Sequence, residues 1–256
     1  MPGRVDALPP PIPAATLVAI RDRLDGAPEL LIVERSDRLA FAAGALVFPG
    51  GRVDPGDRDL AASLGRDDDD GAARVAAVRE TLEETGLAVA IRPEPDETVE
   101  LALRKGLNTG RLLADLLGEA GLRLELERLT PFARWLPNFR ETRRFDARFY
   151  LASAPADSRL PVPDEGESVH AAWMTAADAL RRADRGEAGM LFPTRRNLER
   201  LARYAGFAQA VEDAMRHPPR VITPWIEDRD GQSHVVIPDD LGYPVTSEPL
   251  ATARRA

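Results

Sequence analysis

The chain has 256 residues, of which 44% are hydrophobic and only 5% aromatic; this is enough for one α/β domain with insertions, or for two small domains. Its 34 Lys and Arg against 42 Asp and Glu give a formal net charge of -8. The Arg residues are scattered, which argues against duplex nucleic acid as a partner, and the absence of Cys excludes disulfides, thiolate ligands and a Cys nucleophile.

The first 13 residues are rich in proline and predict a flexible N-terminal arm over residues 1–13. This arm lacks the apolar middle part of a signal peptide. No apolar run reaches the roughly 18 residues that suggest a membrane span. We therefore expect a cytoplasmic protein with no membrane partner.

The sheet is expected to start with two strands, Ala14 to Ile20 and Pro28 to Arg35, the second of which contains a continuous apolar run. The breaker Pro49-Gly50-Gly51 follows a short apolar segment. The polar residues after it, including Asp54 to Asp57 and the acidic run Asp67 to Asp70, are predicted to form exposed loop.

The segment from Ala72 to Thr85 consists of good helix formers, with acids before its N-terminus and Gly86 as its stop. A mixed order of strands and helices follows and favours a sheet covered by helices. The predicted elements are a short strand at 89–91, one or two helices within 97–117, strands at 130–136, 144–151 and 169–174, helices at 176–185 and 194–205, and a hairpin around Asp230-Gly231.

Three glutamates of the predicted helix, Glu80, Glu83 and Glu84, fall within one arc because residues three and four apart share a face. Val75 and Leu82 fall on the opposite side and would pack against the sheet. Carboxylates this close repel each other unless a cation lies between them, and a hard divalent cation such as Mg²⁺ prefers oxygen ligands. By spacing alone, a solvated Glu-rich surface helix is the alternative.

The segment Arg79 to Leu87, RETLEETGL, resembles the second half of the Nudix box, R-E-U-x-E-E-x-G-U, where U is a bulky apolar residue; Thr81 is its one departure. Upstream, Phe48-Pro49-Gly50-Gly51 is similar to the F-P-G-G that precedes the box, and Asp57 stands where the family has its first Glu. The family places seven residues between that Glu and the Arg, whereas 21 separate Asp57 from Arg79, so about 14 are inserted. The resemblance leaves open whether Asp57 replaces that Glu.

The resemblance to Nudix hydrolases implies metal ligation, by Mg²⁺ or Mn²⁺, for Glu80, Glu83 and Glu84. Glu83 and Glu84 are expected to be catalytic as well, and Arg79 to orient a helix glutamate by a salt bridge. Arg79 and Glu83, four residues apart, are suitably spaced for that pair. Many family members carry a further Glu in a late strand, which makes Glu167 a candidate metal ligand or general base.

The resemblance also implies the α/β/α sandwich of the superfamily, with a mixed sheet. The Nudix domain would span residues 14–205 with insertions at about 58–71 and 97–124. A C-terminal extension with a hairpin would occupy residues 206–256. Many members dimerise, so a homodimer is an expectation from the resemblance alone.

Within 31–51, LIVERSDRLAFAAGALVFPGG, the chain is similar to the signature of coenzyme A diphosphatases. Arg35, Ser36, Gly44 and the F-P-G-G segment match in register, whereas Ala40 replaces the second Arg of that signature. Arg35, Ser36, Gly50 and Gly51 are thus candidate substrate-binding residues.

The arginines of segment 143–149, including Arg144, would also be suited to phosphate. A small-molecule diphosphate, with coenzyme A or an acyl derivative first, is the expected substrate. The alternatives are ADP-ribose, a dinucleotide or a nucleotide sugar, or a non-catalytic Nudix-fold binding module.

Overall fold

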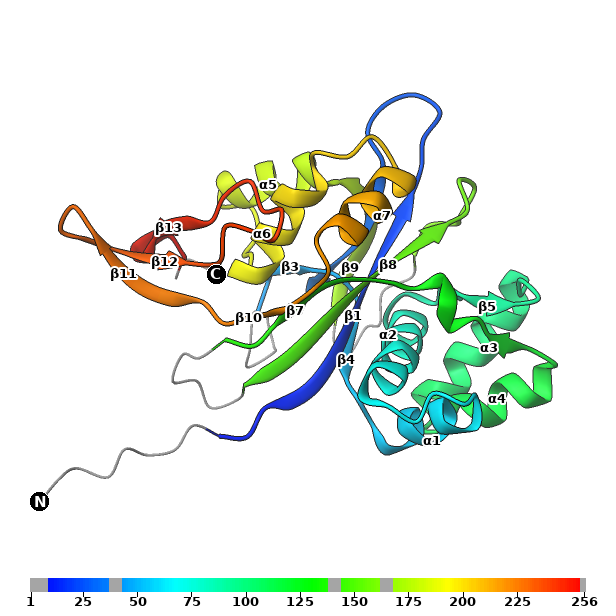
Figure 1. Cartoon of the computed structure of the whole chain (residues 1–256). Coiled ribbons are helices and arrows are strands. Elements are labelled where there is room, and N and C mark those ends of the chain that lie inside the picture. Colours follow the sequence, from blue (N-terminus) through cyan, green and yellow to red (C-terminus); the bar gives the residue numbers. More distant parts are fainter. Residues whose placement is uncertain (1–8, 37–42, 138–143, 162–167, 254–256) are drawn as a thin grey trace, which may run out of the picture.

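The structure is a computed structural model that describes residues 9–36, 43–137, 144–161 and 168–253. A mixed sheet of eight strands runs through its centre (Figure 1). Six of the strands lie in the order β10-β7-β8-β1-β2-β3, while β4 pairs with β1 and β9 pairs with β2. The strands are β1 (Ile12–Arg21), β2 (Glu29–Arg35), β3 (Leu46–Val47), β4 (Gly50–Arg52), β7 (Thr130–Trp135), β8 (Phe145–Ala154), β9 (Ser168–Thr175) and β10 (Val221–Ile222).

Strand β1 is the axis of this sheet. It pairs in parallel with β8 along its whole length, from Ile12 opposite Phe145 to Arg21 opposite Ala154. Successive side chains of a strand point to opposite faces, and the apolar residues of β1 from Leu17 to Ile20 alternate between two separate cores. The sheet is thus buried on both faces, which explains why its first two strands have continuous apolar runs.

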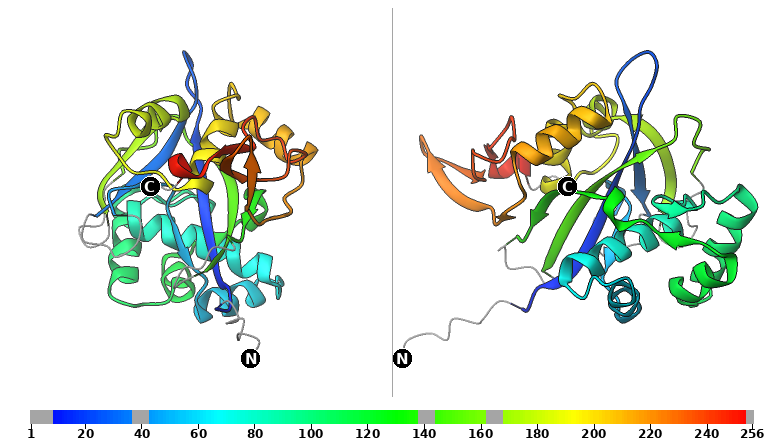
Figure 2. Two further views of the ribbon diagram at one scale, coloured as in Figure 1. Left: turned by 90° about the vertical axis from the view of Figure 1, so that its left-hand side faces the viewer. Right: turned by 45° about the vertical axis from the view of Figure 1, so that its right-hand side comes forward.

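Helices cover the two faces of the sheet (Figures 1 and 2). One face carries the long helix α2, against which α1 and α3 pack, with α4 beyond them. The other face carries α5, α6 and α7. The helices are α1 (Pro55–Ser63), α2 (Asp69–Thr85), α3 (Glu97–Asn108), α4 (Leu113–Ala120), α5 (Ala176–Asp184), α6 (Phe192–Leu201) and α7 (Phe207–Arg216).

This architecture confirms the predicted α/β sandwich with a mixed sheet, a helical insertion and a C-terminal extension. Within the insertion, β5 and β6 pair with each other; within the extension, β11, β12 and β13 form a separate small sheet. The remaining elements are β5 (Ile91–Arg92), β6 (Arg123–Leu124), a 3₁₀ turn at Leu126–Arg128, β11 (Trp225–Arg229), β12 (Gln232–Val236), β13 (Ser247–Pro249) and α8 (Leu250–Ala253).

The polar region predicted as exposed loop is largely helical, so that prediction was wrong. Asp54 is the N-cap of α1, and Pro55 occupies its first turn, a position that proline favours. Asp68 caps α2 by accepting a hydrogen bond of 2.5 Å from the Gly71 amide. The acidic run was interpreted as loop because it is polar, but it starts a helix. Asp68 satisfies one free amide there, and the charges of Asp69 and Asp70 interact favourably with the helix dipole.

The C-terminal extension is built into the main fold more closely than predicted. Its hairpin forms as expected, with Arg229 opposite Gln232 across a turn in which Asp230 and Gly231 have φ angles of 54° and 78°, as a two-residue turn of this kind requires. Helix α7 packs against the sheet, and β10 pairs in parallel with β7. Among the described residues, no helix is both long and apolar enough to cross a membrane.

Candidate active site

Helix α2 is the frame of the candidate site. It begins after the Asp68 cap and ends at Gly86, which adopts a left-handed conformation with φ of 72°, as helix-ending glycines commonly do. Val75 and Leu82 are fully buried against the sheet. Thr81, at the family's apolar position, is fully buried too, and its hydroxyl donates a bond of 2.7 Å to the Ala77 carbonyl. The departure from the box therefore leaves no unsatisfied hydroxyl in the core.

Arg79 is the centre of an ionic cluster on the other side of α2. Its Nη1 donates bonds of 2.8 Å to Oε1 of Glu80 and to Oε2 of Glu83. Its Nη2 donates to the backbone carbonyl of Arg52 at 2.9 Å, at the end of β4. The predicted Arg79–Glu83 pair therefore forms, and Arg79 holds two of the three glutamates while tying α2 to β4.

Asp57 also binds Arg79, despite the inserted residues between them. Its two carboxylate oxygens accept bonds of 2.8 and 2.9 Å from Nε and Nη2 of Arg79, the bidentate geometry that makes Arg–carboxylate pairs strong. Asp57 is only 2% exposed and also accepts a bond from the Asp54 amide in the first turn of α1. The inserted residues thus form the rest of α1 and the start of α2, and Asp57 stays in the site.

The Gly50-Gly51 segment passes close to the glutamates. The Gly50 amide donates a bond of 3.1 Å to Oε2 of Glu84. A Cβ atom on Gly51 would lie 2.5 Å from Oε1 of Glu80, and one on Gly50 would lie 2.7 Å from the Cα of Thr16. Gly50 is therefore required by its close approach to the backbone of β1, whereas a side chain on Gly51 would displace the Glu80 carboxylate.

The electrostatics of the cluster reflect three carboxylates packed around one guanidinium. Burial raises the pKa of Glu80 to about 7, against the opposing effect of Arg79, and the neighbouring Glu83 adds to the increase. Burial likewise raises the pKa of Glu83. Shifts of this origin show that burial disfavours the charged form of these carboxylates, so that a further cation beside them would be stabilising.

The donors of this cluster suit a hard divalent cation. Glu80 and Glu83 each use one oxygen for Arg79, and among the described residues the second oxygen of each has no hydrogen-bond partner. Among the described segments, no three His, Asp or Glu side chains lie close enough together to form a complete metal site as they stand. The oxygen donors themselves, together with the raised pKa of Glu80, fit Mg²⁺ or Mn²⁺.

At the N-terminal end of α2, a second polar cluster anchors the helix to the sheet. Asp70 accepts bonds of 2.6 Å from Arg74 and 2.8 Å from the Tyr150 hydroxyl on β8. Burial alone would raise the pKa of Asp70, but these two hydrogen bonds, together with the charges of Arg74 and Arg148, outweigh it and lower that pKa. The charged form of Asp70 is therefore the one that stabilises the fold.

The other predicted site residues belong to segments outside α1, α2 and β4. Arg35 ends β2 and Ser36 follows it; the Arg35 amide donates to the Ala45 carbonyl. Arg144 donates to the carbonyls of Pro9 and Pro137, so no contact of the described chain joins it to the glutamates. Glu167 lies outside the described residues. Their assignment to the substrate stays a prediction.

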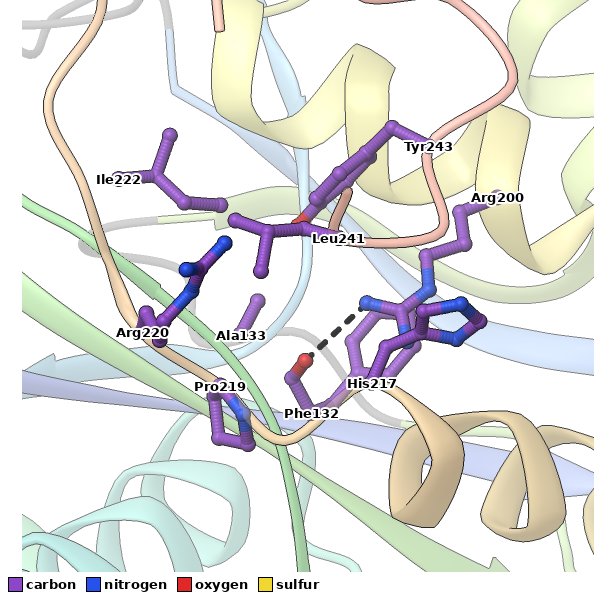
Figure 3. A pocket seen from close by; sticks show the side chains of 9 residues that line it. All are labelled: Phe132, Ala133, Arg200, His217, Pro219, Arg220, Ile222, Leu241 and Tyr243. Atoms are coloured by element: carbon purple, nitrogen blue, oxygen red, sulfur yellow. Dashed lines mark hydrogen bonds between the residues drawn. The ribbon is translucent and has the colours of Figure 1, made fainter. Parts of the chain in front are cut away.

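A small pocket lies on the opposite face of the sheet (Figure 3). It is lined by residues of β7, α6 and the C-terminal extension, and its space does not admit a water-sized sphere. Arg200 in its wall uses Nε and Nη2 for Asp213 and Nη1 for the Phe132 carbonyl. The cation is thus fully engaged, and this pocket is a packing feature of the second core rather than a substrate site.

Comparisons with known proteins agree with this geometry. The model of the NUDIX domain matches residues 10–107. The crystal structure of a NUDIX hydrolase from Alicyclobacillus acidocaldarius is 31% identical, with a TM-score of 0.71, and the match covers 80% of this chain and 97% of that chain.

Other solved structures are more distant. The NUDIX domain of Shewanella oneidensis NrtR, complexed with ADP ribose, is 14% identical with a TM-score of 0.45 over 79% of this chain and 92% of that chain. A hydrolase of the NUDIX family from Clostridium perfringens is 15% identical with a TM-score of 0.40 over 78% of this chain and 95% of that chain. On the identity and coverage of the Alicyclobacillus match and on the domain match, the chain belongs to the Nudix hydrolase family.

Proposed function

We propose that this protein is a metal-dependent hydrolase that cleaves a diphosphate linkage and that its substrate is coenzyme A or an acyl-coenzyme A. The observation that carries the first part is the cluster in which Arg79 holds Asp57, Glu80 and Glu83 beside the Gly50-Gly51 segment. Mg²⁺ or Mn²⁺ bound by Glu80, Glu83 and Glu84 would neutralise charge on the phosphoryl oxygens and make a water nucleophilic near neutral pH.

The chain's own residues would carry out the remaining tasks. Gly50 and Gly51 would border the diphosphate, since the Gly50 amide bonds Glu84 and Gly51 lies against Glu80. Water attacks phosphorus in line, the bond from phosphorus to the bridging oxygen breaks, and a glutamate, Glu83 or Glu84, accepts the proton of the water. Two phosphorylated fragments leave, and the glutamate returns its proton to solvent.

Arg79 acts by position and charge in this scheme. Because its bonds reach α1, β4 and two glutamates, it fixes the carboxylates before substrate arrives, and such preorganisation is a large part of phosphoryl-transfer catalysis. Asp57 in turn fixes Arg79 through its bidentate pair. Asp57 would thus serve in place of the family's first Glu.

The choice of coenzyme A is supported by the segment between β2 and β4. Arg35 and Gly44, which match the coenzyme A diphosphatase signature, lie side by side, since the Gly44 amide donates to the Arg35 carbonyl at 3.1 Å. Gly44 has a φ of 65°, which favours glycine. The Nε of Arg35 is buried and has no hydrogen-bond partner among the described residues, so this guanidinium retains a donor for a phosphate oxygen.

The test is hydrolysis of coenzyme A, an acyl-coenzyme A, ADP-ribose, NADH and a nucleotide sugar, each with Mg²⁺ and with Mn²⁺. Glu83→Gln and Glu84→Gln remove a charge from the site. Glu212→Gln, at an exposed position of α7 on the other face of the sheet, is the matched control. We expect coenzyme A or its acyl form to be split, the two site variants to lose at least about a hundredfold in kcat, and the control to match wild type.

The other outcomes separate the alternatives. Preferred turnover of ADP-ribose, NADH or a nucleotide sugar would keep the mechanism and replace the substrate. Equal residual activity in wild type and both site variants would contradict the mechanism. Folded protein that binds one of these compounds without turnover, with either cation, would identify a binding module instead.

A further inference from the structure

The last turn of α2 carries two of the proposed metal ligands and needs support from outside the helix. The final carbonyls of any α-helix lack partners within it. Here the Gly86 amide satisfies the Leu82 carbonyl, which leaves the carbonyls of Glu83 and Glu84 directed beyond the helix end. Any movement of this turn would move the side chains of the same two glutamates.

Arg104 of the inserted helix α3 satisfies these carbonyls. Its Nε donates a bond of 2.9 Å to the Glu83 carbonyl, and its Nη2 lies 3.4 Å from the Glu84 carbonyl. Arg104 is 8% exposed, and a cation at a helix C-terminus is favourable because the helix dipole is negative there. One buried guanidinium thus contacts the backbone of both glutamates.

A second set of bonds holds the same end of α2 through Glu100, one turn earlier on α3. The Ala88 amide donates to Oε1 of Glu100 at 2.8 Å, and Nε of Arg159 donates to its Oε2 at 2.9 Å. Nη2 of Arg159 in turn donates to the Gly86 carbonyl. A Cβ on Gly86 would lie 3.1 Å from that nitrogen, so glycine there serves the helix end and its support together.

We propose that Arg104 is a positioning residue of the active site: the inserted helix α3 uses it to fix the backbone from which Glu83 and Glu84 reach the divalent cation. This gives the helical part of the insertion at about 97–124 a role in the site itself. The inference rests on the proposed function in that Glu83 and Glu84 are taken to bind the cation.

The test compares Arg104→Met, which keeps an unbranched apolar stem and removes the charge and the donors, with Arg104→Lys, which keeps the charge. Arg111→Met is the matched control, because Arg111 lies between α3 and α4 in the same insertion and pairs with Glu119 at the surface. Three quantities are measured: amide hydrogen exchange over residues 83–88 without metal, Mn²⁺ affinity by electron paramagnetic resonance titration, and kcat and KM.

For Arg104→Met we expect faster exchange confined to residues 83–88, Mn²⁺ affinity lowered by about tenfold as for other residues that orient metal ligands, and a lower kcat with little change in KM. Arg104→Lys should recover most of each loss, and Arg111→Met should equal wild type. Wild-type exchange and Mn²⁺ affinity in a folded Arg104→Met protein would overturn the inference.

If Arg104→Met does not fold, Arg104→Lys decides the question. Faster amide exchange confined to residues 83–88, together with a lower Mn²⁺ affinity, would support the inference. Unchanged Mn²⁺ affinity with uniformly faster exchange would overturn it. A wild-type protein that binds no Mn²⁺ and hydrolyses no diphosphate would refute the proposed function, and the metal-free exchange data would still report whether Arg104 holds the helix end.

Discussion

Replacing Asp57 tests whether the pair with Arg79 stabilises the fold across the insertion. Asp57→Ala removes two hydrogen bonds of 2.8 and 2.9 Å to a guanidinium and the acceptor for the Asp54 amide. Breaking a buried ion pair costs roughly 3–5 kcal/mol. Arg79 keeps Glu80 and Glu83, so the lower end of that range applies, and we expect a loss of about 3 kcal/mol.

The assay is urea unfolding followed by circular dichroism at pH 7. Asp57→Asn, which keeps the shape and one acceptor for Arg79, should lose only about 1–2 kcal/mol. Asp59→Ala, at an exposed position of the same helix, is the control and should change stability by less than about 0.5 kcal/mol. If Asp57→Ala loses no more than Asp59→Ala, the pair does not support the fold and the assignment of Asp57 to the site is wrong.

Three further outcomes are expected. Gly51→Ala places a methyl group against the Glu80 carboxylate and should lower kcat at least tenfold. The control is Gly118→Ala in α4, where a Cβ meets nothing within 4 Å; it should leave kcat unchanged and raise stability slightly. Because folding lowers the pKa of Asp70 from 3.8, its charged form adds stability above about pH 4, and this stability is lost as pH falls through the lower pKa of the folded state. The difference in unfolding free energy between wild type and Asp70→Asn, measured with urea, should therefore shrink from pH 7 to pH 3. A constant difference would contradict this. Turnover should stop in EDTA and return when excess Mg²⁺ or Mn²⁺ is added.

Local patterns in the sequence predicted much of the fold. Apolar segments located β1 and β2, and the apolar stripe and Gly86 located α2. The same patterns failed at α1, where polar residues were interpreted as loop although Asp54 and Pro55 carry the chemistry of a helix start. Capping residues and loop residues are of the same types, and only the packing of α1 against α2 distinguishes them here.

The candidate site was predictable where its contacts are local. The pair of Arg79 and Glu83 follows from a spacing of four residues, whereas the bond from Asp57 to Arg79 crosses 22 positions and no spacing rule anticipates it. Arg104 gave no signal, because one arginine in an amphipathic helix resembles any solvated one until the end of α2 lies beside it. Contacts made by tertiary structure therefore complete a site that sequence motifs outline only in part.

The parallel pairing of β1 with β8 also affects the order in which the protein can be assembled during synthesis. The residues that pair are about 130 positions apart, and closing such a separation is slow compared with forming a helix. On the ribosome, β1 and α2 emerge well before β8, so their apolar faces lack this central strand until Ala154 has left the exit tunnel. The nascent chain is thus prone to aggregation over that interval, and the bond from Arg159 to the end of α2 forms only after more than half of the protein has been made.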